Sequence, residues 1–458
     1  MAFNDVPTDA IPEADLGKAF DFLFSLVDLR KADQMMPLGP ATIYTASVVL
    51  WLLVYQRLNR NCPLWEAVKH LIDTAPQLCP DNKRIRQQTL SPGTGAYSDA
   101  RQRLTPAVTQ WFVDAVSHSI INTTPMLRNQ RVFLIDGTTI TLAPEPALRT
   151  AYPPASNQHG PGVWPVALLV VTHELQSGAA LRPEVGPMYG PQAVSETVLA
   201  RACLQRLPPN SVVLADANFG IFSMAHAIRQ AGHACLLRLT KQRFLALHKK
   251  ATLVDEDGTW KTWSLLWKPS GQDLKSNPHL RPDDCLQVLL HEVQVQPDLT
   301  IWVVTSLPGS ALECLDLYGC RGNVETDISN FKVVLDTETI RATSVAMFHK
   351  ELLTSVVAYN LVVQFRQQAA KLVRLPIRRL SFTGVWTTYR QFLLNAMPLT
   401  PVAWRERYEK ALHYAMRDKL PNRPGRNFER EVYTRRPKSN HFKKRTPPIE
   451  ELPKNKPK

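Results

Sequence analysis

The sequence predicts an α/β protein in which alternating strands and helices form a central region between two helical regions. Helical apolar spacing dominates residues 1–125, and compact β-branched runs alternate with helices through residues 126–370. Helical spacing continues in residues 371–458 and gives way to a basic tail. The apolar fraction of 44% and the charged fraction of 21% are typical of a globular protein. We therefore expect three domains with these boundaries.

The charge balance favours a polyanionic partner. The chain carries 54 Lys and Arg against 40 Asp and Glu, a net charge of +14. Nucleic acid and an anionic membrane surface are both compatible with this excess.

The seven cysteines include no C-x-x-C pair and fit no zinc template, so we expect free thiols in a reducing cytoplasm. Residues 1–15 contain no signal-peptide pattern, and the apolar run 41–55 is too short to span a bilayer.

The first region contains basic residues on short helical segments. Helices are expected over residues 20–29, 41–58, 64–72 and 107–121. Arg101 and Arg103 lie in the segment 97–104, which follows a basic cluster at 83–86. Basic side chains on short helices can contact phosphate groups or enter a groove, so we predict that Arg101 and Arg103 bind DNA. A solvated helix face is the alternative.

Strand patterns begin near residue 126. Strands are expected over residues 131–135, 163–172, 179–188, 211–215 and 234–239, with helices over 193–207 and 222–231. This order predicts a mixed sheet in which the first three strands form an antiparallel meander and the last two are parallel crossovers. Residues 241–310 break the alternation and are expected to form a β-rich insertion. Further helices are expected over residues 347–372, 386–395 and 402–417.

The end of the chain is basic and rich in proline. Residues 421–458 hold twelve Lys and Arg against four Glu, a net charge of +8. Such a composition is typical of a disordered segment that contacts a DNA or RNA backbone. A tail that only increases solubility is the alternative.

Three carboxylates occupy a pattern that structural needs do not explain. Asp136 follows one expected strand, Asp216 follows another, and Glu325 lies on a later helix. Carboxylates that converge from strand ends and a facing helix can hold Mg²⁺, which prefers oxygen ligands. Two such ions could activate a water or a 3′-hydroxyl and stabilise the leaving oxygen of a phosphodiester. For each acid alone, a turn cap or a surface ion pair is the simpler interpretation.

Glu325 shares its helix face with a phenol and two cations. Four residues stand at offsets of three, seven and fourteen: Tyr318, Arg321, Glu325 and Lys332. At about 100° per residue they lie within roughly 60° of one another. Gly319 and Gly322 suggest that the helix begins only near Asn323, a good N-cap residue. A solvated charged face is the ordinary interpretation of such a pattern.

Taken together, these residues resemble those of bacterial insertion-sequence transposases of the DDE type, which have an RNase H-like catalytic core. The spacing from Tyr318 to Lys332 matches the Y-x2-R-x3-E-x6-K signature of the group called insertion sequence family four. Asp136 before Gly-Thr and Asp216 before Ala-Asn-Phe match the first two acids of that group. The resemblance covers about residues 97–332. Gly319-Cys320 and Gly322 depart from it, because relatives commonly carry bulkier residues there.

The resemblance implies a fold and a metal site. The fold would be an RNase H-like mixed sheet with a β-rich insertion, a helical N-terminal DNA-binding domain and a helical, basic C-terminal region. Asp136, Asp216 and Glu325 would be catalytic and would bind two Mg²⁺ ions, with Mn²⁺ as a possible substitute.

The resemblance also implies residues that bind DNA. Tyr318, Arg321 and Lys332 would hold the phosphate backbone of the transposon end or of the target. Trp302 resembles a tryptophan that stacks on a flipped base in hairpin-forming relatives. Burial of Trp302 within the core of the insertion is an equal alternative.

The expected function is excision and insertion of a mobile DNA element. The partners would be double-stranded DNA, as terminal inverted repeats and as target, and a second copy of the chain on the paired ends. The expected location is the bacterial cytoplasm, at the nucleoid. Two alternatives remain open: a domesticated relative that binds DNA without cutting it, and an RNase H-like nuclease acting on RNA or DNA junctions.

Overall fold

The structure is a computed structural model that describes residues 26–39, 42–73, 75–158, 160–334, 336, 340–396 and 401–421. Its contacts divide the chain into a compact unit up to Lys419 and a second unit from Leu420. The fold and the site belong to the first unit. The predicted basic tail, apart from Pro421, and most of the helix expected at 20–29 lie outside the described residues.

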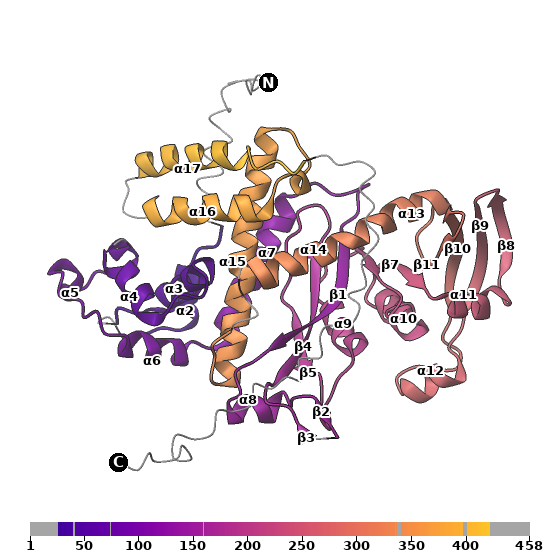
Figure 1. Cartoon of the computed structure of the whole chain (residues 1–458), viewed down its shortest axis with the longest axis horizontal. Coiled ribbons are helices and arrows are strands. Elements are labelled where there is room, and N and C mark those ends of the chain that lie inside the picture. Colours follow the sequence, from indigo (N-terminus) through magenta and orange to yellow (C-terminus); the bar gives the residue numbers. More distant parts are fainter. Residues whose placement is uncertain are drawn as a thin grey trace, which may run out of the picture. The chain divides into compact units, whose positions relative to one another are not determined.

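A nine-stranded sheet forms the centre of the first unit, with strand order β5-β4-β1-β6-β7-β11-β10-β9-β8 (Figure 1). The strand β1 pairs antiparallel with β4, which pairs antiparallel with β5, whereas β1, β6 and β7 run parallel. The predicted meander and parallel crossovers are therefore confirmed, and the arrangement is consistent with an RNase H-like core. The bounds of these strands are Val132–Thr141 (β1), Val166–Glu174 (β4), Glu184–Pro187 (β5), Val212–Ala215 (β6) and Ala234–Leu239 (β7).

The strand expected over residues 179–188 is shorter than predicted. Only Glu184–Pro187 forms a strand, while Ala180 makes an isolated bridge to His173. The preceding turn contains Gly178 with a φ of +76°. Pro183 has no backbone N–H for the ladder, so pairing begins only after it.

The β-rich insertion is confirmed, and it extends the central sheet. Its strand β11 pairs antiparallel with β7, so that Trp302 lies opposite Leu239. The outer strand β8 is exposed along its whole length, and its acidic side chains protect this edge from pairing with another chain. The elements of the insertion are α11 (Lys241–His248), β8 (Thr252–Asp257), β9 (Trp260–Trp267), α12 (Gly271–Ser276), β10 (Leu286–Gln296) and β11 (Leu299–Thr305).

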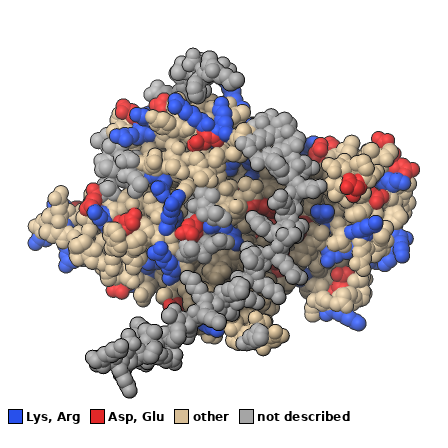
Figure 2. All heavy atoms as spheres, in the orientation of Figure 1, with Lys and Arg blue, Asp and Glu red and all other residues tan. Residues whose placement is uncertain are grey.

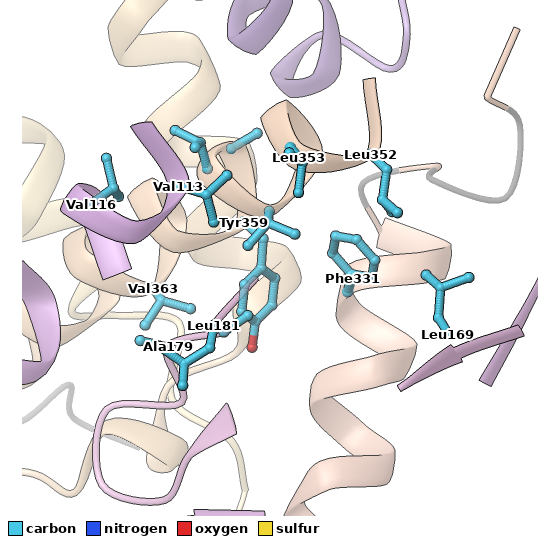
Figure 3. Close-up of a cluster of buried hydrophobic side chains, with 14 of the residues drawn as sticks. Val113, Val116, Leu169, Ala179, Leu181, Phe331, Leu352, Leu353, Tyr359 and Val363 are labelled. Carbon is cyan, nitrogen blue, oxygen red and sulfur yellow. The ribbon is translucent and has the colours of Figure 1, made fainter. Parts of the chain in front are cut away.

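One long helix, α15 (Val345–Leu372), connects the helical parts with the sheet. Its side chains are buried almost all the way round, because helices of the N-terminal and C-terminal regions surround it and Tyr359 meets His173 of β4 edge to face. Figure 3 shows Tyr359 of this helix beside Phe331 and Val363, with Val113 and Leu169 in the same cluster. The rings of Tyr359 and Phe331 meet edge to face with centroids 6.0 Å apart.

The other helices largely follow the predicted spans. Those packed around α15 are α3 (Ala46–Leu58), α7 (Pro106–Thr123), α16 (Phe382–Ala396) and α17 (Pro401–Ala415). Shorter helices are α2 (Arg30–Met35), α4 (Leu64–Asp73), α5 (Lys83–Arg86), α6 (Gly95–Arg103) and α8 (Pro146–Ala151). Helices α9 (Glu196–Leu204) and α10 (Phe222–Gln230) make the crossovers to β6 and β7.

Within the described parts of the chain, every helix is too short or too polar to cross a bilayer. All seven cysteines are free, as predicted.

Candidate active site

The sequence predicted that Asp136 follows the end of a strand. In the structure, Asp136 lies within the strand. The strand β1 continues to Thr141, and Asp136 is paired with Val171 of β4. The parallel pairing of β1 with β6, however, stops at Leu134. Asp136 therefore lies just beyond the end of the parallel ladder, on the side where β6 leaves the sheet at Ala215. Asp216 follows β6 directly, as predicted.

A second helix and a 3₁₀ turn precede the helix that carries Glu325. Helix α13 (Ala311–Gly319) starts at Ser310, whose side chain forms a reciprocal capping box with Glu313. A 3₁₀ turn (Cys320–Gly322) leads into α14 (Asn323–Ser329), and a π-helical turn (Asn330–Val334) follows. Gly319 and Gly322 both have helical dihedral angles. The α-helix that carries Glu325 thus begins at Asn323, as predicted, but its N-cap is Gly322, and helical backbone already precedes it because the cap at Ser310 starts α13 upstream.

The three predicted carboxylates converge on the guanidinium group of Arg321. Its Nη2 lies 2.9 Å from Oδ2 of Asp136 and 3.6 Å from Oδ2 of Asp216. Its Nη1 lies 2.7 Å from Oε1 of Glu325, one helical turn away. The side chains of Arg321 and Asp136 are only 15% and 17% exposed, so their ion pair is partly shielded from solvent, whereas the Glu325 side chain is 54% exposed.

Backbone N–H groups orient both aspartates. Oδ1 of Asp136 accepts a 2.9 Å hydrogen bond from the N–H of Gly137, and Oδ1 of Asp216 accepts one of 2.9 Å from the N–H of Asn218. Each Oδ2 is left to face Arg321. Burial raises the pKa of Asp136 to about 6; Arg321 opposes this shift and the charge of Asp216 adds to it. The site therefore concentrates negative charge and compensates it with one shared cation.

The donor set suits a divalent cation. Among the described residues, no group of three or more His, Cys, Asp or Glu side chains is already arranged around a common metal position. The guanidinium group of Arg321 stands between the acids. Three carboxylates from β1, the end of β6 and α14 already share one cationic partner, and carboxylate oxygens are the ligands of hard divalent ions. Asp136, Asp216 and Glu325 would hold such an ion once Arg321 moves aside.

Tyr318 and Lys332 lie on the same helical segment as Glu325. Tyr318 is 8% exposed and packs with Cys314 and Val324 in a small second core. Burial raises the pKa of Tyr318, and the nearby Arg238 and Arg321 oppose this shift. Lys332 is half-buried in the π-helical turn. Their contact with DNA stays a prediction.

Trp302 packs within the insertion. Its Nε1 donates a 2.9 Å hydrogen bond to Oε1 of Glu292 on the neighbouring strand, and its ring centroid lies 6.0 Å from that of Phe244. The side chain is half-buried. These contacts are those expected if Trp302 belongs to the core of the insertion. Stacking of Trp302 on a DNA base stays a prediction.

Arg101 and Arg103 have different surroundings on α6. Nη2 of Arg101 lies 2.6 Å from Glu351 of α15, and the side chain is 13% exposed. Arg57 shares the same carboxylate at 2.8 Å, so Arg101 helps to anchor the N-terminal helices on α15. Arg103 is exposed and lines a surface hollow together with Arg84. Of Arg101 and Arg103, it is Arg103 that has an exposed side chain available to a phosphate group in this conformation.

Positive charge is spread over the molecule. Figure 2 shows Lys and Arg side chains over the helical part and also over the part that contains β8–β11, interspersed with acidic ones. The described surface on this face therefore carries basic groups both over the helices and over the β8–β11 end of the sheet.

Glu196 is an acid of the site that sequence reasoning missed. It is the first residue of α9, and its Oε2 accepts a 2.5 Å hydrogen bond from Nδ2 of Asn218. Its charge also acts on Asp136. Glu196 lies 60 positions from Asp136 in the chain, and only its place at the start of an expected crossover helix could have singled it out.

Comparison with known families identifies the central part of the chain. The family model described as "Transposase DDE domain" matches residues 128–361, slightly more than half of the chain, and this span contains Asp136, Asp216 and Glu325. DDE transposase domains use divalent metal ions. No curated protein matches the sequence. The chain belongs to the family of proteins that contain a transposase DDE domain.

Proposed function

We propose that this protein is a DNA transposase that cuts the ends of an insertion sequence and joins them to target DNA. The observation that supports this best is the convergence of Asp136, Asp216 and Glu325 on a single cationic group. The spacing of Tyr318, Arg321, Glu325 and Lys332 supports membership of insertion sequence family four, and with it a cut-and-paste route. The proposed cofactor is Mg²⁺, as two ions, with Mn²⁺ as a substitute.

The chemistry would be in-line phosphoryl transfer. Bound divalent ions would lower the pKa of the attacking water or 3′-hydroxyl and neutralise the charge on the leaving oxygen. Asp136 and Asp216 would present their Oδ2 atoms, since their Oδ1 atoms are held by backbone N–H groups. Glu325 would complete the set from the facing helix.

Arg321 would have a second role during the reaction. While the acids hold no cation, its single positive charge offsets part of their negative charge. Once bound cations offset the charge of the acids, this side chain is available to form a bidentate pair with two oxygens of a phosphate group, which is a strong charge-assisted interaction. Lys332 and Tyr318 lie on the same helical segment and would contact the backbone of the same strand.

The proposed partners are double-stranded DNA and a second copy of the chain. Arg103 would contribute a phosphate contact from the N-terminal helices, and Trp302 would stack on a flipped base if the ends pass through hairpins. The net charge of +14 favours this association and predicts that it weakens as the salt concentration rises. A dimer would place one site on each end of the element.

Strand cleavage of DNA that carries the terminal repeats, found in the DNA flanking the coding region, tests the proposal. We expect cleavage with Mg²⁺ or Mn²⁺, its loss in Asp216→Ala and Glu325→Gln, and its retention in the exposed control Asp255→Asn. Full activity of the first two variants would contradict the assigned roles of the acids.

The same assay separates the two alternatives. Tight DNA binding without nicking by the wild type would favour a domesticated DNA-binding protein. Preferential cleavage of RNA or of DNA junctions in competition would favour an RNase H-like nuclease.

A further inference from the structure

Glu196 touches the two residues whose N–H groups hold the aspartates. One of them is Gly137, whose N–H is bonded to Oδ1 of Asp136; the other is Asn218, whose N–H is bonded to Oδ1 of Asp216. The carboxylate of Glu196 accepts a hydrogen bond from the side chain of Asn218 at 2.5 Å. It also lies directly over the Cα of Gly137. One side chain on α9 thus spans the two aspartate-bearing segments.

Gly137 is required by this arrangement for steric reasons. Its backbone has no positive φ, so an L-residue could adopt its conformation. A Cβ added there would overlap Oε1, Cδ and Cγ of Glu196. The space that a side chain would need is therefore filled by the Glu196 carboxylate.

We infer that Glu196 is a positioning residue that fixes Asp136 and Asp216 relative to each other, an inference that rests on the proposed function of these acids. Cation ligands must be held in a defined geometry, and residues that orient ligands from outside the coordination shell typically change metal affinity or activity about 10- to 100-fold when replaced. The parallel ladder between β1 and β6 ends at Leu134 and Leu214, before either aspartate. Beyond that point, the ladder no longer pairs β1 with β6, and the Glu196 side chain connects the two segments through its contacts with Gly137 and Asn218.

The contact between Glu196 and Gly137 allows the link to be broken from either residue. Glu196→Ala removes the link directly. Gly137→Ala displaces the far end of a flexible side chain, so it should leave the fold intact and separate Glu196 from Asn218. Glu196→Gln keeps an oxygen that can accept from Asn218. Glu256→Ala, on the exposed strand β8, is the matched control.

The experiment is a calorimetric titration of the purified full-length chain with Mn²⁺, together with its thermal unfolding. Glu196→Ala and Gly137→Ala should each weaken Mn²⁺ binding about 10- to 100-fold with unchanged Tm. The double variant should be no weaker than Glu196→Ala, because both changes break one link. Glu196→Gln and the control should bind as the wild type does.

Three results would overturn the inference: wild-type affinity in Glu196→Ala, additive losses in the double variant, or a Glu196→Gln variant as weak as Glu196→Ala. The last would mean that the charge of Glu196 matters and not its position. The titration contains no DNA, so a wild-type protein that binds Mn²⁺ but cuts no DNA would refute the proposed function and leave this inference standing. A wild-type chain that does not bind Mn²⁺ would refute both.

Discussion

The buried ion pair between Asp327 and Arg378 should be among the most sensitive places in the protein. Asp327 lies on α14, two residues after Glu325, and its side chain is 1% exposed. Nη1 and Nη2 of Arg378 donate to its two oxygens, both at 2.7 Å. The pair packs against the turn at Gly178 that follows β4. It therefore joins the helix of Glu325 to the turn after β4 and to the 3₁₀ turn Ile377–Arg379, which carries Arg378.

Replacing Arg378 with Ala would leave the Asp327 carboxylate buried without its main partner. Removal of one member of a buried pair typically lowers the free energy of unfolding by about 3–5 kcal/mol. Domains are stable by only about 5–15 kcal/mol, so the loss would be a large part of the total. The double replacement Asp327→Leu/Arg378→Met should recover most of it, because two apolar groups leave no buried charge unpaired.

Urea unfolding followed by circular dichroism measures this change as a shift of the midpoint with an unchanged slope. Arg30→Ala is the matched control, since Arg30 forms the same bidentate pair with Asp28, at 2.8 Å for both bonds, but with side chains 85% and 57% exposed. Its removal should have no measurable effect. Equal midpoints for Arg378→Ala and Arg30→Ala would refute the reasoning that burial determines the contribution of such a pair.

Three further predictions concern the site and the insertion. Because burial raises the pKa of Asp136 to about 6, Mn²⁺ affinity should rise with pH up to about 6 and level off above it, as calorimetric titrations at several pH values would show. When a chelator removes the metal, the raised pKa of Asp136 adds to the free energy of unfolding at pH values below the ordinary pKa of 3.8. This contribution is lost as the pH rises through about 6. Arg321→Ala leaves the three acids without their shared cation, so Mg²⁺ should raise its Tm by more than that of the wild type; equal increments would contradict the bridging role. Trp302→Phe loses the hydrogen bond to Glu292 and should lower the free energy of unfolding by about 1 kcal/mol in urea, whereas an unchanged midpoint would argue against a structural role.

Much of the architecture follows from local pattern. Runs such as residues 131–135 and 211–215 are β-branched and apolar because both faces of a central strand are buried, and this pattern was sufficient to predict the meander, the crossovers and the insertion. The helical spacing from Tyr318 to Glu325 likewise placed the acid and its basic neighbours on one face. Local preference also gave the start of α14 at Asn323, but it did not predict the separate helix α13, which the cap at Ser310 begins upstream.

The contacts across the sheet were decided only by tertiary structure. Sequence spacing predicted three acids in the right order, but not that Arg321 would stand between them, since its direction depends on how α14 and the turn before it pack against β1. It gave no sign of Glu196, which reaches Gly137 and Asn218 because the crossover after β5 returns α9 to the end of the parallel ladder. It also placed Arg101 on a DNA-facing surface, whereas the structure pairs that side chain with Glu351, 250 positions away. Periodicity is a property of neighbouring residues, while partners so far apart in the chain are chosen by the packing of the whole fold.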